Sequence, residues 1–195
     1  DLIDAYHTDM DVAMTLIEQA IQIAPIYYVS GNHEVWSRLY DEVKEALEAR
    51  GVVVLENQKV EISKGEAHID LIGLSDLAVR QSTWIETRGL LEDLINESKN
   101  FKIVLSHRPE MFNVYASSQV DLVFTGHAHG GQVRLPFIGG LVAPDQGLFP
   151  QLTEEMHISE QTSMVISRGL GNSIIPLRVF NRPELIVVTL SNESL

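Results

Sequence analysis

Three apolar segments of this chain each end in a small residue, and side chains able to bind metal follow at once. Ile26–Ser30 runs into Gly31-Asn32-His33-Glu34, Lys102–Ser106 into His107-Arg108, and Asp121–Thr125 into Gly126-His127-Ala128-His129. Active sites of α/β sheets lie outside the carboxyl ends of their strands. The recurrence therefore predicts a sheet whose neighbouring strands bring distant His and Asn residues to one site.

Hydrophobic spacing predicts the elements around these segments. We expect one helix from Thr8 to Pro25 with Val12, Leu16, Ala20 and Ile23 on its apolar face, a second with Trp36, Leu39, Tyr40, Val43 and Leu47 on one face, and a third over 84–98. Strands are expected over 26–30, 52–55, 59–63, 68–74, 101–105, 121–125, 163–167 and 185–190. Early alternation followed by a strand-rich end predicts a layered α/β fold, with sheets covered by helices.

Composition limits the possible functions. The length of 195 residues fits one domain. The absence of cysteine excludes disulfides, zinc–thiolate sites and thiol nucleophiles. A net charge of −13 argues against a nonspecific grip on nucleic acid. The chain starts at Asp1 without a Met, so we expect any targeting segment to lie upstream.

The residue types at the strand ends indicate a metal. His, Asp and Asn without Cys suit divalent metals such as Mn, Fe, Zn, Co or Ni. His127 and His129 stand two residues apart between glycines, so a tight turn could aim both imidazoles the same way. A pair of metals about 3.5–4 Å apart is a known clamp for phosphoryl displacement.

These motifs, in this order, resemble the signature of the calcineurin-like metallophosphoesterases. Asp1-Leu2-Ile3-Asp4 looks like the tail of the Gly-Asp-x-x-Asp motif of that family. The resemblance implies an αββα fold, with two packed sheets flanked by helices. It also implies that residues 1–195 form a single domain lacking its first strand and N-terminal βα unit.

Later stretches resemble the bacterial YkuE-like branch of this family. They are Gly130-Gly131-Gln132, Gln146–Phe149, Ser167–Asn172 and Asn181–Glu184. That branch includes proteins similar to the UDP-diacylglucosamine pyrophosphohydrolases of lipid A synthesis. The implied substrate is a phosphorylated small molecule or a lipid of the cell envelope. Membrane association would come through the missing N-terminus, and the compartment stays open between the cytoplasm and the extracytoplasmic face of the membrane.

The resemblance assigns metal ligands residue by residue. Asp1 would bridge two divalent metals, which would be Mn, Fe or Zn. Asn32, His107 and His127 would complete the second metal site, and His129 would bind at the first. The implied reaction is cleavage of a phosphodiester or pyrophosphate bond by a metal-bound hydroxide.

Two further residues receive catalytic roles from the resemblance. His33 would act on the leaving group and Asp4 would hold it, because a nearby carboxylate favours a protonated imidazole. The alternative role for Asp4 is purely structural, as the cap of a turn or helix.

Departures from the family pattern keep other functions open. The opening Asp-x-His motif of the family is absent, and it would precede Asp1. Its absence motivates an alternative, a non-catalytic binding module on the same fold. Ser30 stands where Ser/Thr protein phosphatases have Arg, which argues against that activity. A β-lactamase-like hydrolase would need a His-x-His-x-Asp-His run, whereas glycines follow His129.

Several other side chains are candidates for substrate contact. Arg108, Arg168 and Arg182 could clamp a phosphate or form surface ion pairs. Phe137, Leu148 and Phe149 lie in a loop-rich stretch and are the best candidates for contact with an apolar substrate or lipid. No motif surrounds His7, His68 or His157, so we expect no role for them.

Overall fold

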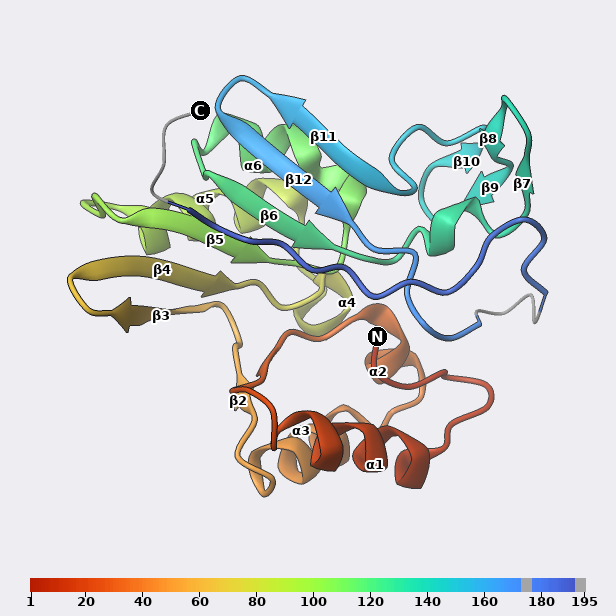
Figure 1. The fold of residues 1–195 in the computed structure, drawn as a ribbon, viewed down its shortest axis with the longest axis horizontal. Coiled ribbons are helices and arrows are strands. Elements are labelled where there is room, and N and C mark those ends of the chain that lie inside the picture. The colour runs from red at the N-terminus through yellow and green to blue at the C-terminus, as the bar shows by residue number, and fades with distance from the viewer. Residues whose placement is uncertain (173–176, 192–195) are drawn as a thin grey trace.

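A six-stranded sheet forms the centre of the molecule (Figure 1). The computed structural model describes residues 1–172 and 177–191. The strands lie in the order β11 (Glu155–Ser159), β12 (Thr162–Ile166), β6 (Leu122–Thr125), β5 (Phe101–Leu105), β4 (Ala67–Gly73) and β3 (Gln58–Lys64). The four inner strands are parallel to one another, and the two edge strands are antiparallel to their neighbours. The predicted α/β class is confirmed.

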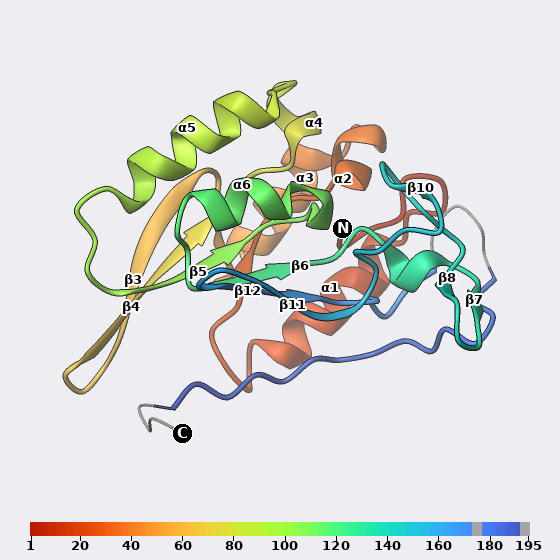
Figure 2. The same ribbon diagram turned by 90° about the horizontal axis from the view of Figure 1, so that it is seen from above.

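Helices α5 (Trp84–Ile95) and α6 (Phe112–Ser117) cover one face of this sheet (Figure 2). Thr83 begins α5 with a capping box, in which its hydroxyl accepts from Glu86 N and the Glu86 carboxylate accepts from Thr83 N. Leu91 of α5 and Tyr115 of α6 are fully buried against Val104 and Val123 of the sheet. Short helix α4 (Leu77–Arg80) and 3₁₀ helix η1 (Pro109–Met111) connect the strands to these helices.

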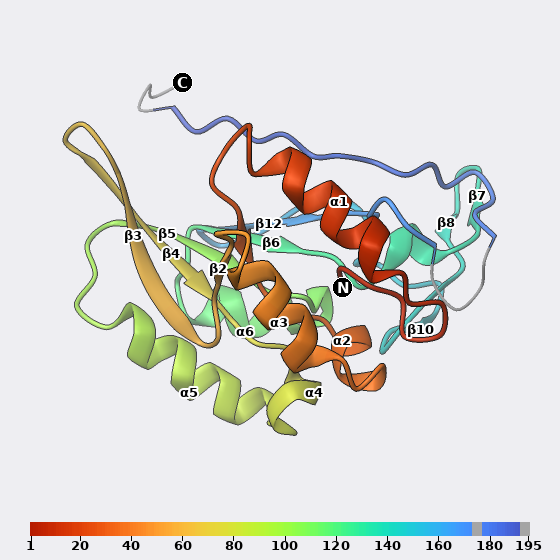
Figure 3. The same cartoon turned by 90° about the horizontal axis from the view of Figure 1, so that it is seen from below.

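The first helix of the chain and the segment 177–191 lie on the opposite side of the sheet from α5 (Figure 3). Helices α1 (Met10–Ala20) and α3 (Tyr40–Glu48) share an apolar cluster with the two-stranded parallel sheet of β1 (Tyr27–Tyr28) and β2 (Val53–Val54). Leu55, Val29 and Ile186 pack on this face of the central sheet. The layers thus run helices, central sheet, small sheet and helices.

The apolar face of α1 differs from the prediction. Ala13, Met14 and Ile17 are buried, whereas Val12 and Leu16 are exposed. The expected face was wrong because both sets of residues recur at helical spacing, and packing on α3 selects the set that faces inward.

The predicted second helix is in fact two helices. Short α2 (Asn32–Trp36) ends before Arg38, whose φ of +63° breaks the helix, and α3 begins at Tyr40. Trp36 is consequently half-exposed, while Val43 and Leu47 are fully buried as expected.

The strand predicted over 185–190 does not form within the described residues. Ile186 packs on the sheet, but Leu185 and Val187 are exposed. A strand requires a neighbour to accept and donate ladder hydrogen bonds, and alternating hydrophobicity alone cannot supply one.

Four short strands form a lobe beside the carboxyl ends of the central strands (Figure 1). They are β7 (Arg134–Leu135), β8 (Gly139–Gly140), β9 (Val142–Ala143) and β10 (Gly147–Leu148), paired as two antiparallel hairpins. Phe137, Leu148 and Phe149 project from this lobe into solvent. None of the described helices combines the length and apolar character needed to cross a bilayer.

Candidate metal centre

Two neighbouring parallel strands deliver the first pair of histidines. β5 and β6 end side by side, and Gly126 N donates to the carbonyl oxygen of His107 at 3.1 Å. The His107 and His127 rings meet edge to face, with centroids 4.6 Å apart. The motifs after these strands are therefore brought together as the sequence predicts.

Four donor atoms converge where these rings meet. His107 Nε2 lies 2.9 Å from His127 Nδ1, 2.9 Å from Asn32 Oδ1 and 3.2 Å from Asp1 Oδ2. Among residues 1–172 and 177–191, Asp1, His107 and His127 form one of two groups of three potential ligands within 4.8 Å of one another. One carboxylate oxygen (Asp1), one amide oxygen (Asn32) and two imidazole nitrogens form a donor set that fits a borderline divalent cation.

Burial keeps the imidazoles of this cluster neutral. Desolvation lowers the pKa of His107 well below its usual value, and His127 lowers it further. Desolvation also lowers the pKa of His127, against the opposing effect of its hydrogen bond to Asp145. Neutral imidazoles keep the lone pairs that a metal needs.

The turn that carries His127 and His129 has an uncommon backbone. Both histidines adopt positive φ, at +61° and +47°, as do Gly130 and Gly131. Few residues other than glycine enter this region, although His is enriched there. Asn181 holds the turn, since its side-chain amide donates to the carbonyl oxygens of His129 and Gln132 at 2.6 and 3.0 Å.

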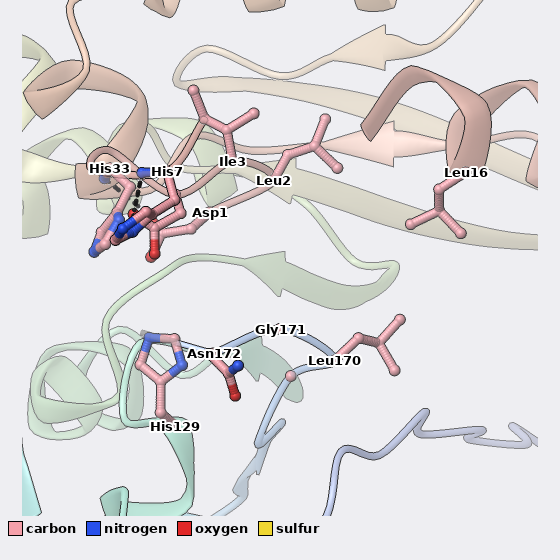
Figure 4. Close-up of a pocket in the computed structure, with 12 residues that line it drawn as sticks. Asp1, Leu2, Ile3, His7, Leu16, His33, His129, Leu170, Gly171 and Asn172 are labelled. Carbon is pink, nitrogen blue, oxygen red and sulfur yellow. Dashed lines mark hydrogen bonds and ion pairs between the residues drawn. The ribbon is translucent and has the colours of Figure 1, made fainter. Parts of the chain in front are cut away.

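His129 lies apart from the four-donor cluster. It lines a cavity of about 560 Å³ together with Asp1, Asp4, His33 and neighbouring residues. Figure 4 shows the polar side chains gathered at one end of this cavity, with Leu16 and Leu170 toward the other. Desolvation, Arg178 and His127 lower the pKa of His129 to about 4, so its ring is neutral at pH 7.

His33 faces the same cavity from the first turn of α2. Its Nδ1 accepts a hydrogen bond from Ala5 N at 3.0 Å, and its ring centroid lies 6.4 Å from that of Tyr6 and 5.3 Å from that of Trp36. Because Nδ1 is the acceptor, the proton of the neutral ring sits on Nε2. Desolvation lowers the pKa of His33, although Asp4 opposes this.

Asp4 acts on the backbone of its own turn. Its Oδ1 accepts from Tyr6 N at 2.7 Å and from His7 N at 3.1 Å. The same turn places Ala5 N where it donates to His33 Nδ1. Asp4 therefore supports His33 through this turn. The exposed imidazole of His7 also lines the cavity, where no role was expected.

Glu34 is a residue of the Gly-Asn-His-Glu motif for which the sequence indicated no role. It is fully buried and accepts from Leu2 N, Ile3 N and Gly31 N at 2.6, 3.2 and 2.8 Å. Burial works to raise its pKa, but the hydrogen bonds from these amides favour the ionised carboxylate, and the pKa of Glu34 is lowered overall. Glu34 thus ties the segment after Asp1 to the start of α2, which carries Asn32.

Arg108 joins three carboxylates and is committed to ion pairs. It binds Asp76 through Nε and Nη2 at 2.7 and 3.1 Å, and its Nη1 contacts Glu110 and Asp145 at 3.3 and 2.7 Å. Glu110, His127 and Asp145 form the second group of potential ligands among the described residues. The guanidinium already supplies positive charge there, so an ion-pair network explains this group. No motif in the sequence singled out Asp76 or Asp145.

Two C-terminal stretches singled out in the sequence, Ser167–Asn172 and Asn181–Glu184, meet beside the turn that carries His127 and His129. The Glu184 carboxylate accepts from Arg168 N at 2.9 Å and Arg168 Nη2 at 2.6 Å, and Glu184 N donates to Gly169 O at 3.2 Å. Arg168 also lies 3.6 Å from Glu154. Arg168 therefore joins the C-terminal segment to the sheet, whereas Arg182 is exposed.

The sequence of this chain is similar to a known family of proteins and to several of its members. The profile of the family described as calcineurin-like phosphoesterase matches residues 1–131. The metallophosphoesterase YkuE of Bacillus subtilis is 31% identical over 166 residues, covering 84% of this chain and 55% of the relative. The phosphodiesterase YaeI of Escherichia coli is 28% identical over 171 residues, covering 87% of this chain and 59% of the relative. The chain thus spans little more than half the length of each.

One solved structure shares the fold. The sulfate thiohydrolase SoxB of Thermus thermophilus, solved with glycerol, superposes with a TM-score of 0.53. The two are 13% identical, and the alignment covers 80% of this chain and 30% of SoxB. At this identity the likeness shows the arrangement of helices and sheet alone.

Proposed function

Because the chain belongs to the calcineurin-like phosphoesterase family, whose members are hydrolases, we propose that it is a dinuclear metal-dependent phosphohydrolase that cleaves a phosphodiester or pyrophosphate bond. The observation that carries this proposal is the convergence of Asp1, Asn32, His107 and His127 around one point beside a cavity. The relative YaeI, named as a phosphodiesterase, supports the same reaction class.

The residues present fit a divalent metal. Asp1, Asn32, His107 and His127 would hold one ion, and Asp1 and His129 would contribute to a second. We propose Mn, Fe or Zn, which suit mixed oxygen and imidazole donors. When bound, such ions neutralise charge on a phosphoryl group and lower the pKa of water towards roughly 7.

His33 is proposed as the group that acts on the leaving oxygen. Its Nδ1 is occupied by Ala5 N, which directs the N–H of Nε2 away from the turn. Because His33 lines the cavity, this N–H can donate to an oxygen of a bound phosphoester. Tyr6 and Trp36 hold the ring in this orientation, so little ordering is needed when substrate binds.

The cavity supports a substrate with both charged and apolar parts. Its lining includes Leu2, Ile3, Leu16 and Leu170 in addition to the histidines and acids. Apolar walls with a few convergent polar groups are typical of small-molecule sites. We propose a phosphorylated small molecule or a lipid of the cell envelope, in which the phosphoryl group faces the histidines.

Hydrolysis of bis-p-nitrophenyl phosphate tests the proposal. The assay is run with Mn²⁺, Fe²⁺ or Zn²⁺ on the 195-residue chain and on the full product of its gene. We expect metal-dependent release of nitrophenol that a chelator abolishes. Lack of turnover by both proteins with every metal would overturn the proposal.

The alternative is a non-catalytic binding module on the same fold, which a gene sequence lacking Asp-x-His upstream of Asp1 would favour. Turnover, measured on protein of known metal content, separates the two functions. Bound metal without turnover of a diester, a pyrophosphate or a phospholipid would support the binding module, whereas turnover by either protein would exclude it.

A further inference from the structure

We propose that Asp145 is a positioning residue that orients His127 toward the metal centre, and that Arg108 and Asp76 hold Asp145 in place. This inference rests on the proposed function only in taking His127 as a metal ligand. The residue lies in the loop between β9 and β10, outside the motifs that carry the proposed metal ligands.

The two nitrogens of His127 face different partners. Nδ1 lies 2.9 Å from His107 Nε2, inside the four-donor cluster, whereas Nε2 lies 3.0 Å from Asp145 Oδ2. The ring itself is buried, so its nitrogens are committed to these neighbours.

Hydrogen-bond chemistry then selects the tautomer. A neutral imidazole has one donor and one acceptor nitrogen, and an ionised carboxylate can only accept. Asp145 therefore requires the proton of His127 to sit on Nε2, which leaves the Nδ1 lone pair facing His107 Nε2, the atom on which Asn32 and Asp1 also converge. Carboxylates that hold metal-binding histidines in this way raise the basicity of the ligand and fix its ring.

A chain of charged contacts fixes Asp145 itself. Arg108 Nη1 donates to the same Oδ2 at 2.7 Å, and the rest of the guanidinium is clamped on Asp76. The Asp76 side chain has no exposed surface, and its backbone N donates to Ser30 Oγ at 3.1 Å. The chain of contacts thus begins at Ser30, two residues before Asn32 at the start of α2, and ends on His127.

The backbone at Asp145 adopts an uncommon conformation. Its φ is +57°, a region where Asp and Asn are enriched among residues with a Cβ. Half of the side chain remains exposed (52%), so neither burial nor core packing accounts for its placement. The positive φ also guides the choice of variants, because Gly and Asn both tolerate it.

Two variants separate orientation from fold. Asp145→Gly removes the acceptor without backbone strain, and Asp145→Asn keeps an oxygen that can accept from Nε2–H. The ring nitrogens of His127 are followed by two-bond ¹H–¹⁵N NMR in metal-free protein, assigned with His127→Gln, and Mn²⁺ affinity is measured by electron paramagnetic resonance.

We expect wild type to show protonated Nε2 at His127. Asp145→Gly should mix the tautomers and weaken Mn²⁺ binding by about 10- to 100-fold, and Asp145→Asn should restore most of both. Glu110→Gln is the matched control, because Glu110 shares Arg108 but makes no hydrogen bond to His127, whose ring nitrogens face His107 and Asp145.

The outcomes that would contradict this inference differ from the outcome that would contradict the proposed function. Protonated Nδ1 in wild type, or an Asp145→Gly protein with unchanged tautomer and affinity, would overturn the inference. An equal loss in Glu110→Gln would assign the effect to Arg108 and remove Asp145 from the role. If wild type binds no Mn²⁺ but shows the expected tautomer shift, the proposed function fails while the positioning of His127 by Asp145 stands.

Discussion

At the scale of single residues, Gly31 shows why the Gly-Asn-His motif needs its glycine. A Cβ at this position would lie 2.0 Å from Asp1 Oδ1, closer than any real contact. The φ of Gly31 is −108°, so the requirement is for space and not for an unusual backbone angle. The carboxylate of Asp1 occupies that space and accepts from His33 N at 2.9 Å.

We therefore expect Gly31→Ala to displace Asp1 and weaken Mn²⁺ binding by about tenfold or more. Gly89→Ala is the control, since no atom lies within 4 Å of the added Cβ and the site is inside α5. The control should keep Mn²⁺ affinity and gain about 0.5–1 kcal/mol of stability. Isothermal titration and urea unfolding measure the two quantities, and unchanged Mn²⁺ affinity in Gly31→Ala would contradict this account.

His33→Ala should lower kcat for a phosphodiester by about 10²–10⁴-fold, the usual contribution of a positioned acid or base. Metal content should stay at the wild-type level, because His33 Nδ1 is bound to Ala5 N and the ring is outside the four-donor cluster. Steady-state kinetics with elemental analysis checks both. The control is His68→Ala, an exposed imidazole paired with Glu61. Equal loss of metal and of rate in His33→Ala would make His33 a ligand.

At the scale of elements, Asp76 and Arg108 connect the loops that follow β4 and β5. Asp76 caps α4 by accepting from Ala78 N at 2.9 Å, and its carboxylate binds the guanidinium of Arg108, the residue after His107. Burial opposes ionisation of Asp76, but the hydrogen bonds and charge of Arg108 lower its pKa overall.

Asp76→Asn should reduce the free energy of unfolding at pH 7 by about 3–5 kcal/mol, because it leaves a partly buried guanidinium underpaired. The folded pKa lies below the unfolded value of about 3.9. The stabilisation is therefore complete above about pH 4, and it is lost as the pH falls through the folded pKa. Urea unfolding across pH 3–7 should show the deficit of the variant shrinking in acid.

Glu92→Gln is the control for Asp76→Asn. It removes an exposed ion pair with Arg88 on α5, which should change stability by less than about 0.5 kcal/mol. A deficit in Asp76→Asn no larger than in this control, or one that persists unchanged in acid, would contradict the role of the Asp76 carboxylate.

Prediction of the elements from sequence succeeded where the local pattern was sufficient. The strand over 101–105 was predicted to the residue, and those at 121–125 and 163–167 within one residue, because short apolar runs with polar borders mark buried strands. The face of α1 and the segment 185–190 were wrong, because the first depends on what packs against the helix and the second on a neighbouring strand.

At the scale of the whole molecule, the donor atoms come from two layers. Asp1 and Asn32 belong to the N-terminal third, whereas His107 and His127 lie at the ends of central strands. The positions of these residues were predictable because each lies within a motif. Those of Asp76 and Asp145 were not, since no motif contains them and their roles arise from contacts between loops. Asn181 lies in a stretch singled out from the sequence, but its contact with the turn of His129 was not predicted.

A metal that joins the two layers should stabilise the entire fold. We expect Mn²⁺ at about 100 times its Kd to raise the free energy of unfolding by about 2.7 kcal/mol. Amide exchange should slow most near Asp1 and Asn32. Thermal unfolding and hydrogen exchange measure the effect, with His127→Ala as the control that should lose it. An unchanged melting temperature in saturating Mn²⁺ would contradict the bridging of the layers.

The wide spacing of the donors also bears on how the protein acquires its activity during folding. Asp1 and Asn32 meet His107 across 106 and 75 residues of chain. Contacts of such high sequence separation close late, after the local helices and hairpins have formed. Affinity for metal is therefore a gauge of complete folding, since a partly folded chain would contain every motif and yet have nowhere to bind the ion.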